Sequence, residues 1–361
     1  MKASSHFFHP TTPCSVGLIM IGCLIATAWG CLGPMTAHAH QARELYNKAV
    51  SLALNGDIAS ATQHIEDALT DFPQFAEAHH LLGVLLAQEP STSSQAVSSL
   101  RRAIELNPHL AKAHYDLGLV LIKQQQFTEA KQLLHTALTT YPKYWEARLA
   151  LAKLHEHTQA YEQAMQEYHA VLSNHPDQPE ALYNLAYLYE QDGQASEAMT
   201  LLTQLTQSVP THADGWHLLG RMYEQQSQLS TAIEAYQQAI TNRPDHIHAH
   251  YDLGALYQHQ RQSGEAIEQF ETVSRLDPEH VEALLNLGIL YAENDQLDEA
   301  EHAYKKAIGL DPTLVEAYYN LGTFYEFYRK DTTQALVQYQ QYLKLGGKDE
   351  RIRSLTKQIA P

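Results

Sequence analysis

Small and large apolar residues recur along this chain in units of 34 or 35 residues. The eighth position of every unit is Gly or Ala, and the twentieth is Ala once two one-residue insertions are allowed for. Leu is frequent at the seventh position and Tyr at the eleventh. Such a unit predicts two antiparallel helices of about 14 residues each, with the small residues where the helices cross. The units begin at Ala42, Ala76, Ala111, Trp145, Pro179, Ala213, Ile247, Val281 and Val315.

Prolines mark the ends of these units. Eight of them share one spacing, 35 residues once and 34 thereafter: Pro73, Pro108, Pro142, Pro176, Pro210, Pro244, Pro278 and Pro312. Because proline cannot continue a helix, each is expected to end the second helix of a unit. The two insertions fall at residues 90–93 and 329–332, where we expect loops.

This pattern resembles the tetratricopeptide repeat family from residue 42 to about residue 349. The sequence departs from the family at position four, where Trp occurs only as Trp216, and at Gly347, which replaces the terminal proline. The resemblance implies an all-α fold, a right-handed superhelical solenoid of helix-turn-helix repeats. Nine repeats are expected, at residues 42–75, 76–110, 111–144, 145–178, 179–212, 213–246, 247–280, 281–314 and 315–349.

Residues 350–361 are expected to form a capping helix after the last repeat. Asp349 and Glu350 stand at its start and basic residues follow, as the helix dipole favours. Ile352, Leu355 and Ile359 fall on one helical face. A terminal repeat needs such a cover, because an open inter-repeat face would aggregate.

Residues 1–39 have the features of a secretory signal peptide. They contain no acidic residue, one Lys near the start, an apolar run at residues 16–32, a Gly-Pro pair and an A-x-A exit at residues 37–39. Cleavage is therefore predicted between Ala39 and His40.

Two alternatives to cleavage stay open. Uncleaved, the apolar run of 17 residues is just long enough to anchor the chain in a membrane. Alternatively, Cys23 or Cys31 carries the lipid of a bacterial lipoprotein. All three interpretations place the repeats outside the cytoplasm, in the periplasm or the extracellular space.

The charge and the cysteine content of the chain exclude several classes of function. The chain has 41 acidic residues against 24 basic ones, a formal net charge of −17, which repels nucleic acid and attracts basic proteins or peptides. Its three cysteines, Cys14, Cys23 and Cys31, all lie in the leader. The body therefore has no disulfide framework, zinc knuckle or cysteine nucleophile. We expect no cofactor and no nucleic-acid partner.

The first helix of each repeat supplies the candidate binding residues. The family resemblance implies that positions two, five, six, nine, twelve and thirteen line a concave groove. Position five is often aromatic, as in Tyr46, Tyr115, Tyr183, Tyr251 and Tyr319. Position six is often an amide or acid, as in Asn47, Asp116, Asn184, Asp252, Asn286 and Asn320.

The asparagines at position six resemble the peptide-backbone clamp of O-linked GlcNAc transferases. An amide side chain can donate to a carbonyl and accept from an N–H of an extended peptide without reading its sequence. The alternative is that Asn and Asp are common solvated residues at this position of the repeat.

Residues typical of catalysis and metal binding are interpreted as structural. In the histidine-rich run at residues 245–250, alternate positions do not share one helical face, so no metal site is predicted. Acids recur at position two, where the helix dipole favours them: Glu77, Glu146, Glu180, Asp214, Glu282 and Glu316. No phosphate loop, catalytic triad or paired catalytic carboxylates stand out, so no enzymatic activity is expected.

The sequence therefore predicts a non-enzymatic protein- or peptide-binding scaffold of the cell envelope, which holds partner segments in its groove. The alternative is a membrane-anchored structural subunit of an envelope secretion, assembly or polysaccharide-export complex. A membrane is expected to be contacted only through the N-terminal segment, and only if that segment stays uncleaved.

Overall fold

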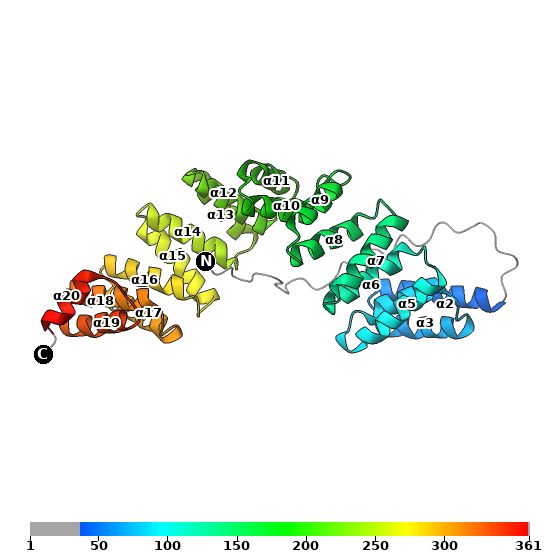
Figure 1. The fold of residues 1–361 in the computed structure, drawn as a ribbon, viewed down its shortest axis with the longest axis horizontal. Coiled ribbons are helices and arrows are strands. Elements are labelled where there is room, and N and C mark those ends of the chain that lie inside the picture. Colours follow the sequence, from blue (N-terminus) through cyan, green and yellow to red (C-terminus); the bar gives the residue numbers. More distant parts are fainter. Residues whose placement is uncertain (1–36, 360–361) are drawn as a thin grey trace. The chain divides into compact units, whose positions relative to one another are not determined.

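The computed structural model describes residues 37–359, and every regular element in that range is a helix (Figure 1). The predicted all-α fold is confirmed. The predicted signal peptide and its two alternatives lie outside the described residues, except for residues 37–39, which begin α2 (Ala37–Leu54). Among the described residues, no helix combines the length and hydropathy that crossing a membrane requires.

The chain divides into two compact units, the first ending at Pro176 and the second beginning at Asp177. After α2, unit 1 contains α3 (Ile58–Asp71), α4 (Ala76–Leu86), η2 (Pro90–Thr92), α5 (Ser93–Leu106), α6 (Ala111–Lys123), α7 (Phe127–Thr140), α8 (Trp145–His157) and α9 (Tyr161–Leu172). The even-numbered helix of each pair packs on the helix that follows it, and consecutive pairs stack through α3 on α4, α5 on α6 and α7 on α8.

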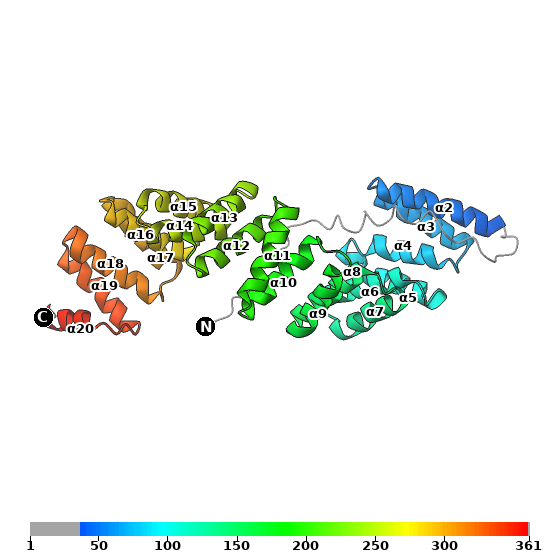
Figure 2. The same ribbon diagram turned by 90° about the horizontal axis from the view of Figure 1, so that it is seen from above.

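Unit 2 repeats this arrangement (Figure 2). It contains α10 (Pro179–Gln191), α11 (Ala195–Ser208), α12 (Ala213–Gln225), α13 (Leu229–Asn242), α14 (Ile247–His259), α15 (Ser263–Leu276), α16 (Val281–Glu293), α17 (Leu297–Leu310), α18 (Val315–Phe324), η3 (Tyr325–Arg329), α19 (Thr332–Lys344) and α20 (Glu350–Ile359). From α4 to α18, each even-numbered helix begins at a residue that the sequence periodicity marks as the start of a unit.

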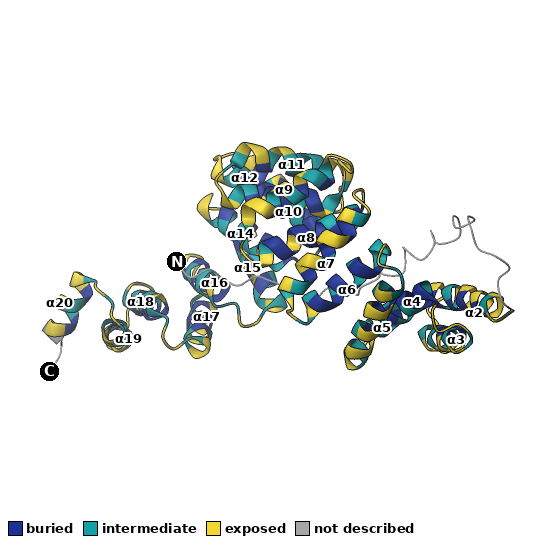
Figure 3. Cartoon of the chain, turned by 45° about the vertical axis from the view of Figure 1, so that its right-hand side comes forward, coloured by how far each residue is buried: buried dark blue, intermediate teal, exposed yellow. Residues whose placement is uncertain are grey.

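Apolar packing holds each pair together, and the buried residues follow one side of each helix (Figure 3). The small residues at position eight lie where a large side chain of the second helix approaches. A Cβ atom added to Gly288 would lie 2.5 Å from the ring of Tyr304, and one added to Gly322 would lie 2.5 Å from the ring of Tyr339. Glycine therefore makes room for the buried tyrosine at these crossings.

In every described helix pair except α4–α5, the turn inside the pair contains a residue with left-handed backbone geometry. Gly56 and Gly193 hold this position in two pairs, with φ of 84° and 77°. In other pairs a residue with a side chain adopts φ between 56° and 61°, namely Gln125, Gln159, Ser227, Arg261, Asp295 and Lys330. Side chains other than glycine are strained in this region of backbone space.

The two insertions are absorbed as short helical turns. Residues 90–92 form the 3-10 turn η2 ahead of α5. At the second site the extra residue is taken up by the π-helical turn η3, which continues α18, so the predicted loop at residues 329–332 shrinks to Lys330 and Asp331. A π turn adds one residue without breaking the helix, which explains the difference.

The helix α20 covers the end of unit 2, as the sequence predicted. Ile352 is fully buried in the cluster that contains Tyr339 and Phe324, and Leu355 packs against the same cluster. Arg351 donates from Nη1 to both carboxylate oxygens of Glu326, at 2.8 and 3.0 Å.

Candidate functional site

The aromatic residues at position five pack between consecutive helix pairs. Each ring lies against the residue just before the next first helix: Tyr46 on Phe75 at 5.1 Å, Tyr115 on Tyr144 at 5.0 Å, Tyr183 on His212 at 5.4 Å and Tyr251 on His280 at 5.0 Å between ring centroids. In the last pair, Tyr319 packs on Tyr342 of α19 at 5.5 Å. Burial raises the pKa of Tyr46 to about 12 and also raises the pKa of Tyr251. These rings fill junctions between layers, which leaves only part of each for a ligand.

Side chains at position six reach back to position five of the preceding pair. Asp116 lies 2.6 Å from Nε2 of His80, and Asp252 lies 2.7 Å from Nε2 of His217. In the next junction, Nδ2 of Asn286 donates to the hydroxyl of Tyr251 at 3.4 Å. The remaining members of the predicted ladder are the exposed Asn47 and the half-buried Asn184 and Asn320. At least half of the ladder therefore takes part in contacts between repeats.

A signal for these contacts is present in the sequence, although the sequence analysis did not find it. Asp occupies position six in two units, and in both cases position five of the preceding unit is His. Where that preceding residue is Tyr251, position six is Asn286 instead. A histidine and a carboxylate one repeat apart thus mark a junction, because the ring can donate to the carboxylate.

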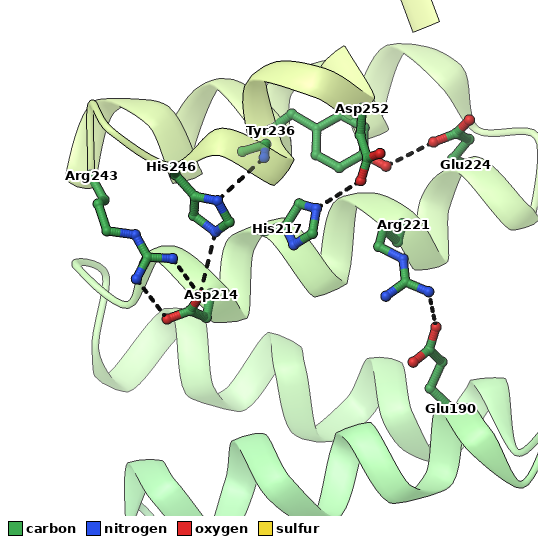
Figure 4. A network of polar contacts seen from close by, with 10 residues as sticks. Glu190, Asp214, His217, Arg221, Glu224, Tyr236, Arg243, His246 and Asp252 are labelled. Atoms are coloured by element: carbon green, nitrogen blue, oxygen red, sulfur yellow. Dashed lines mark hydrogen bonds and ion pairs between the residues drawn. The ribbon is translucent and has the colours of Figure 1, made fainter. Parts of the chain in front are cut away.

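The polar network around α12, α13 and α14 is shown in Figure 4. Arg243 and His246 both approach the carboxylate of Asp214, with Nη1 of Arg243 at 3.1 Å from Oδ2 and Nε2 of His246 at 3.4 Å from Oδ1. Burial alone would raise the pKa of Asp214, but the hydrogen bonds from His246 and Arg243 hold that pKa well below its usual range. Asp214 is therefore ionised throughout the physiological range.

Two further pairs complete the network. The hydroxyl of Tyr236 donates to Glu224 at 2.7 Å, and Arg221 donates to Glu190 of α10 at 2.6 Å. The side chain of Glu190 is only 5% exposed, so this ion pair joins α10 to α12 within the stack. The network thus cross-links consecutive first helices of unit 2.

The three histidines of the run at residues 245–250 differ in burial and in their contacts. His246 is buried at the start of α14, His248 is exposed, and His250 is buried with Nε2 at 3.0 Å from the carbonyl oxygen of Pro244. Within residues 37–359, no group of three or more His, Cys, Asp or Glu side chains is arranged to hold a metal ion.

Positions two, nine and thirteen of the first helices form what we call the first-helix face. Residues seven and eleven apart fall on one side of an α-helix. In all pairs of both units these positions remain at least partly exposed. At position nine they include the apolar residues Val50, Val84, Leu119, Tyr187 and Ile289. Partly exposed apolar side chains at repeat spacing suit the binding of another chain.

The first helices differ in charge between the units. In unit 2 they carry eight acidic residues and one basic residue, Arg221, whereas in unit 1 they carry five acidic and six basic ones. The whole of unit 2 has 27 acidic and 13 basic residues, a net charge of −14, and unit 1 contributes the remaining −3.

A hollow of about 470 Å³ lies between α12 and α13, where Trp216 and Tyr223 face Glu234, Gln237 and Gln238. Nε1 of Trp216 donates to the carbonyl oxygen of Pro210 at 2.8 Å, which fixes the ring. Trp216 is the only tryptophan at position four of a repeat, and the sequence analysis did not assign it a role.

Sequence comparison finds models of the tetratricopeptide repeat over the first part of the described chain and a TPR-like model over most of the rest. Two models described as Tetratricopeptide repeat match, one at residues 159–222 and the other at residues 46–111, 89–130 and 115–179. A third, described as the middle TPR-like domain of cilia and flagella-associated protein 70, matches residues 216–345. No curated protein matches the sequence.

Solved structures share the fold at low sequence identity. The C-terminal part of a TPR repeat-containing protein from Cytophaga hutchinsonii is 13% identical, with a TM-score of 0.55, and the match covers 68% of this chain and 99% of that one. The pilF protein of Pseudomonas aeruginosa is 19% identical, with a TM-score of 0.52, and the match covers 58% and 95%. What these structures share with this chain is the fold, a stack of helix pairs.

Proposed function

Because this chain is built from tetratricopeptide repeats, we propose that it is a non-enzymatic scaffold of the cell envelope that holds protein or peptide segments along its first-helix face. The observation that carries the proposal is the partial exposure of positions two, nine and thirteen in every pair. Nine repeats behind a secretory signal peptide form part of the same proposal. No enzymatic domain accompanies the repeats in the described chain.

The acidic first helices of unit 2 favour a basic partner segment. Glu282 and Glu316 at position two are exposed, as are Glu180 and Glu293. Lys and Arg side chains of an extended segment would gain from this potential, most strongly at low ionic strength. Apolar residues of the same segment would pack on position nine.

The test compares substitutions on the first-helix face with matched substitutions elsewhere. Leu119→Asp and Tyr187→Asp change position nine in one pair of each unit. Tyr161→Asp and Val337→Asp change exposed residues of second helices, 48% and 52% exposed, again one in each unit. Binding of the full chain to an array of basic, neutral and acidic peptides should fall about tenfold with the face variants, the loss typical of a central contact. Equal losses in both sets, with unchanged helical content, would exclude the face.

The asparagine ladder remains a prediction within this proposal. Replacing Asn184, Asn286 and Asn320 together by Ala should weaken peptide capture, if these amides grip a peptide backbone, and should lower the melting temperature no more than loss of the Asn286–Tyr251 contact does. Tyr251→Phe is the control, because it removes the hydroxyl that Asn286 contacts and leaves every amide in place. Undiminished capture by the triple variant rules out the ladder.

The second candidate, a membrane-anchored subunit of an envelope complex, is favoured by the apolar run of the leader. The two functions predict different amino termini. A mature chain that begins at His40 supports the soluble scaffold, whereas a chain that begins at Met1 and sediments with membranes supports the anchored subunit. Mass spectrometry of the intact protein from both fractions distinguishes them.

A further inference from the structure

Three first helices of unit 2 begin with a histidine whose ring accepts a backbone hydrogen bond. Nδ1 of His212 accepts from the amide of Gly215 at 2.9 Å, at the start of α12. Nδ1 of His246 accepts from Ala249 at 3.3 Å, and Nδ1 of His280 accepts from Ala283 at 3.3 Å. These are N-cap contacts, in which a side chain satisfies one of the free amides of the first turn.

The contact requires a neutral ring. Nδ1 can accept only while its lone pair is free, so each cap needs the tautomer that carries its proton on Nε2. Protonation places an N–H group opposite the backbone N–H group and breaks the cap. It also adds a positive charge at the positive end of the helix dipole, which is unfavourable.

Charged and titratable groups surround the first two cap histidines. His212 faces the Tyr183 ring of α10, the carboxylate of Asp214 and Arg243. His246 faces Asp214 and His217 of α12, together with Arg243 and His248.

At the third cap, His280 stacks on Tyr251 of α14, and its Nδ1 lies 3.4 Å from the carboxylate of Glu282. Glu282 and Asp214 offset part of the cost of a charged ring. They cannot restore the lost cap, because the backbone amide needs an acceptor.

In other first helices, the residue at the cap position is not one that changes its charge near neutral pH. In unit 1 the corresponding residues are Phe75, Leu110 and Tyr144, whose side chains make no cap hydrogen bond. In unit 2, α10 is capped by Gln178, whose Oε1 accepts from the amide of Ala181 at 2.9 Å. An amide side chain can therefore cap the helix as the neutral imidazole does, and it does so at every pH.

We propose that unit 2 contains an acid-sensitive device, in which protonation of His212, His246 and His280 uncaps α12, α14 and α16 together while unit 1 keeps its helix starts. The three caps belong to three consecutive pairs. Their loss therefore loosens the first turns of adjacent layers, where the position-two residues Asp214, His248 and Glu282 lie.

The direction of the pH dependence follows from burial. Burial lowers the pKa of His212 and His246 in the folded protein, although Asp214 raises both in part. As the pH falls through about 6.5, the ordinary histidine value, the unfolded chain therefore binds protons before the folded chain does. Stability of unit 2 is retained above that pH and is lost below it, down to the folded-state pKa values.

Hydrogen exchange of the full chain tests the proposal. Between about pH 7.5 and about pH 5.5, after correction for intrinsic rates, protection at Gly215, Ala249 and Ala283 should fall about fivefold, the usual effect of a lost cap, whereas Ala181 beside Gln178 should be unchanged. The triple variant His212→Gln, His246→Gln, His280→Gln copies Gln178 and should remove this dependence. Uniform behaviour of all four amides, or an unchanged pH dependence in the triple variant, overturns the proposal.

A second measurement is independent of the variants' folding. Long-range proton–nitrogen correlation spectra of histidine-labelled wild-type protein report the tautomer of each ring. At neutral pH the three cap rings should carry their proton on Nε2 alone. A proton on Nδ1 at any of the three would contradict the assignment of that ring as a cap.

Discussion

Nε2 of His80 lies 2.6 Å from a carboxylate oxygen of Asp116, and these two residues occupy adjacent positions of consecutive repeats. The same relationship joins His217 to Asp252 at 2.7 Å in unit 2. Each pair ties the first helix of one helix pair to the first helix of the next. A periodic sequence thus uses one residue combination at selected junctions, where a hydrogen bond supplements apolar packing.

Removing one partner of such a pair should destabilise the unit that contains it. Asp252→Asn is expected to cost about 1 kcal/mol, the usual net contribution of one hydrogen bond in a protein. His217→Tyr combined with Asp252→Asn copies the Tyr251–Asn286 junction and should cost less than the two single changes added together. Urea unfolding followed by circular dichroism measures the cycle, and strict additivity would show that the two side chains do not interact.

The left-handed turn residues offer stabilising substitutions. Gln159→Gly and Arg261→Gly should each stabilise the protein by about 0.5–1 kcal/mol, because glycine adopts positive φ without a steric penalty, as Gly56 and Gly193 do. Gly193→Ala should destabilise it by a similar amount. A Cβ atom there would meet nothing within 4 Å, so backbone strain alone acts. Thermal melting of the three variants checks the sign, and a stabilising Gly193→Ala would refute the argument.

The crossing of α16 and α17 should resist a larger residue at position eight. Gly288→Ala places a methyl group 2.5 Å from the Tyr304 ring and should cost about 1–3 kcal/mol through overpacking. Adding Tyr304→Leu copies the combination of Ala186 and Leu202 in α10 and α11. If crowding at this crossing causes the loss of stability, the free energy of unfolding of the double variant should be higher than the two single losses added together predict. Chemical denaturation of the three variants measures this difference.

The helix α20 should be needed for the stability of the last pair. Ile352→Ala removes a fully buried side chain and is expected to cost about 2–4 kcal/mol. Lys357→Ala, at an exposed site of the same helix, should change stability by less than about 0.5 kcal/mol. The measurements are urea unfolding and light scattering, since an uncovered final pair exposes apolar surface. Equal effects of the two changes would argue against a capping role.

Sequence periodicity was sufficient to predict the helix pairs, because the small residues at position eight and the terminal prolines act locally. It was insufficient for contacts between pairs. The His80–Asp116 contact joins residues 36 positions apart, and recognising it required combining position five of one unit with position six of the next. The caps at His212, His246 and His280 were missed because imidazole is not among the usual capping side chains. The π turn at residues 325–329 was missed because periodicity locates an extra residue without giving its backbone geometry.

The unequal charge of the two units has a consequence for the surfaces that each unit can approach. With −14 on unit 2 and −3 on unit 1, an anionic lipid surface repels unit 2 much more strongly than unit 1. This repulsion acts only within a Debye length of the surface, so added salt weakens the difference between the units.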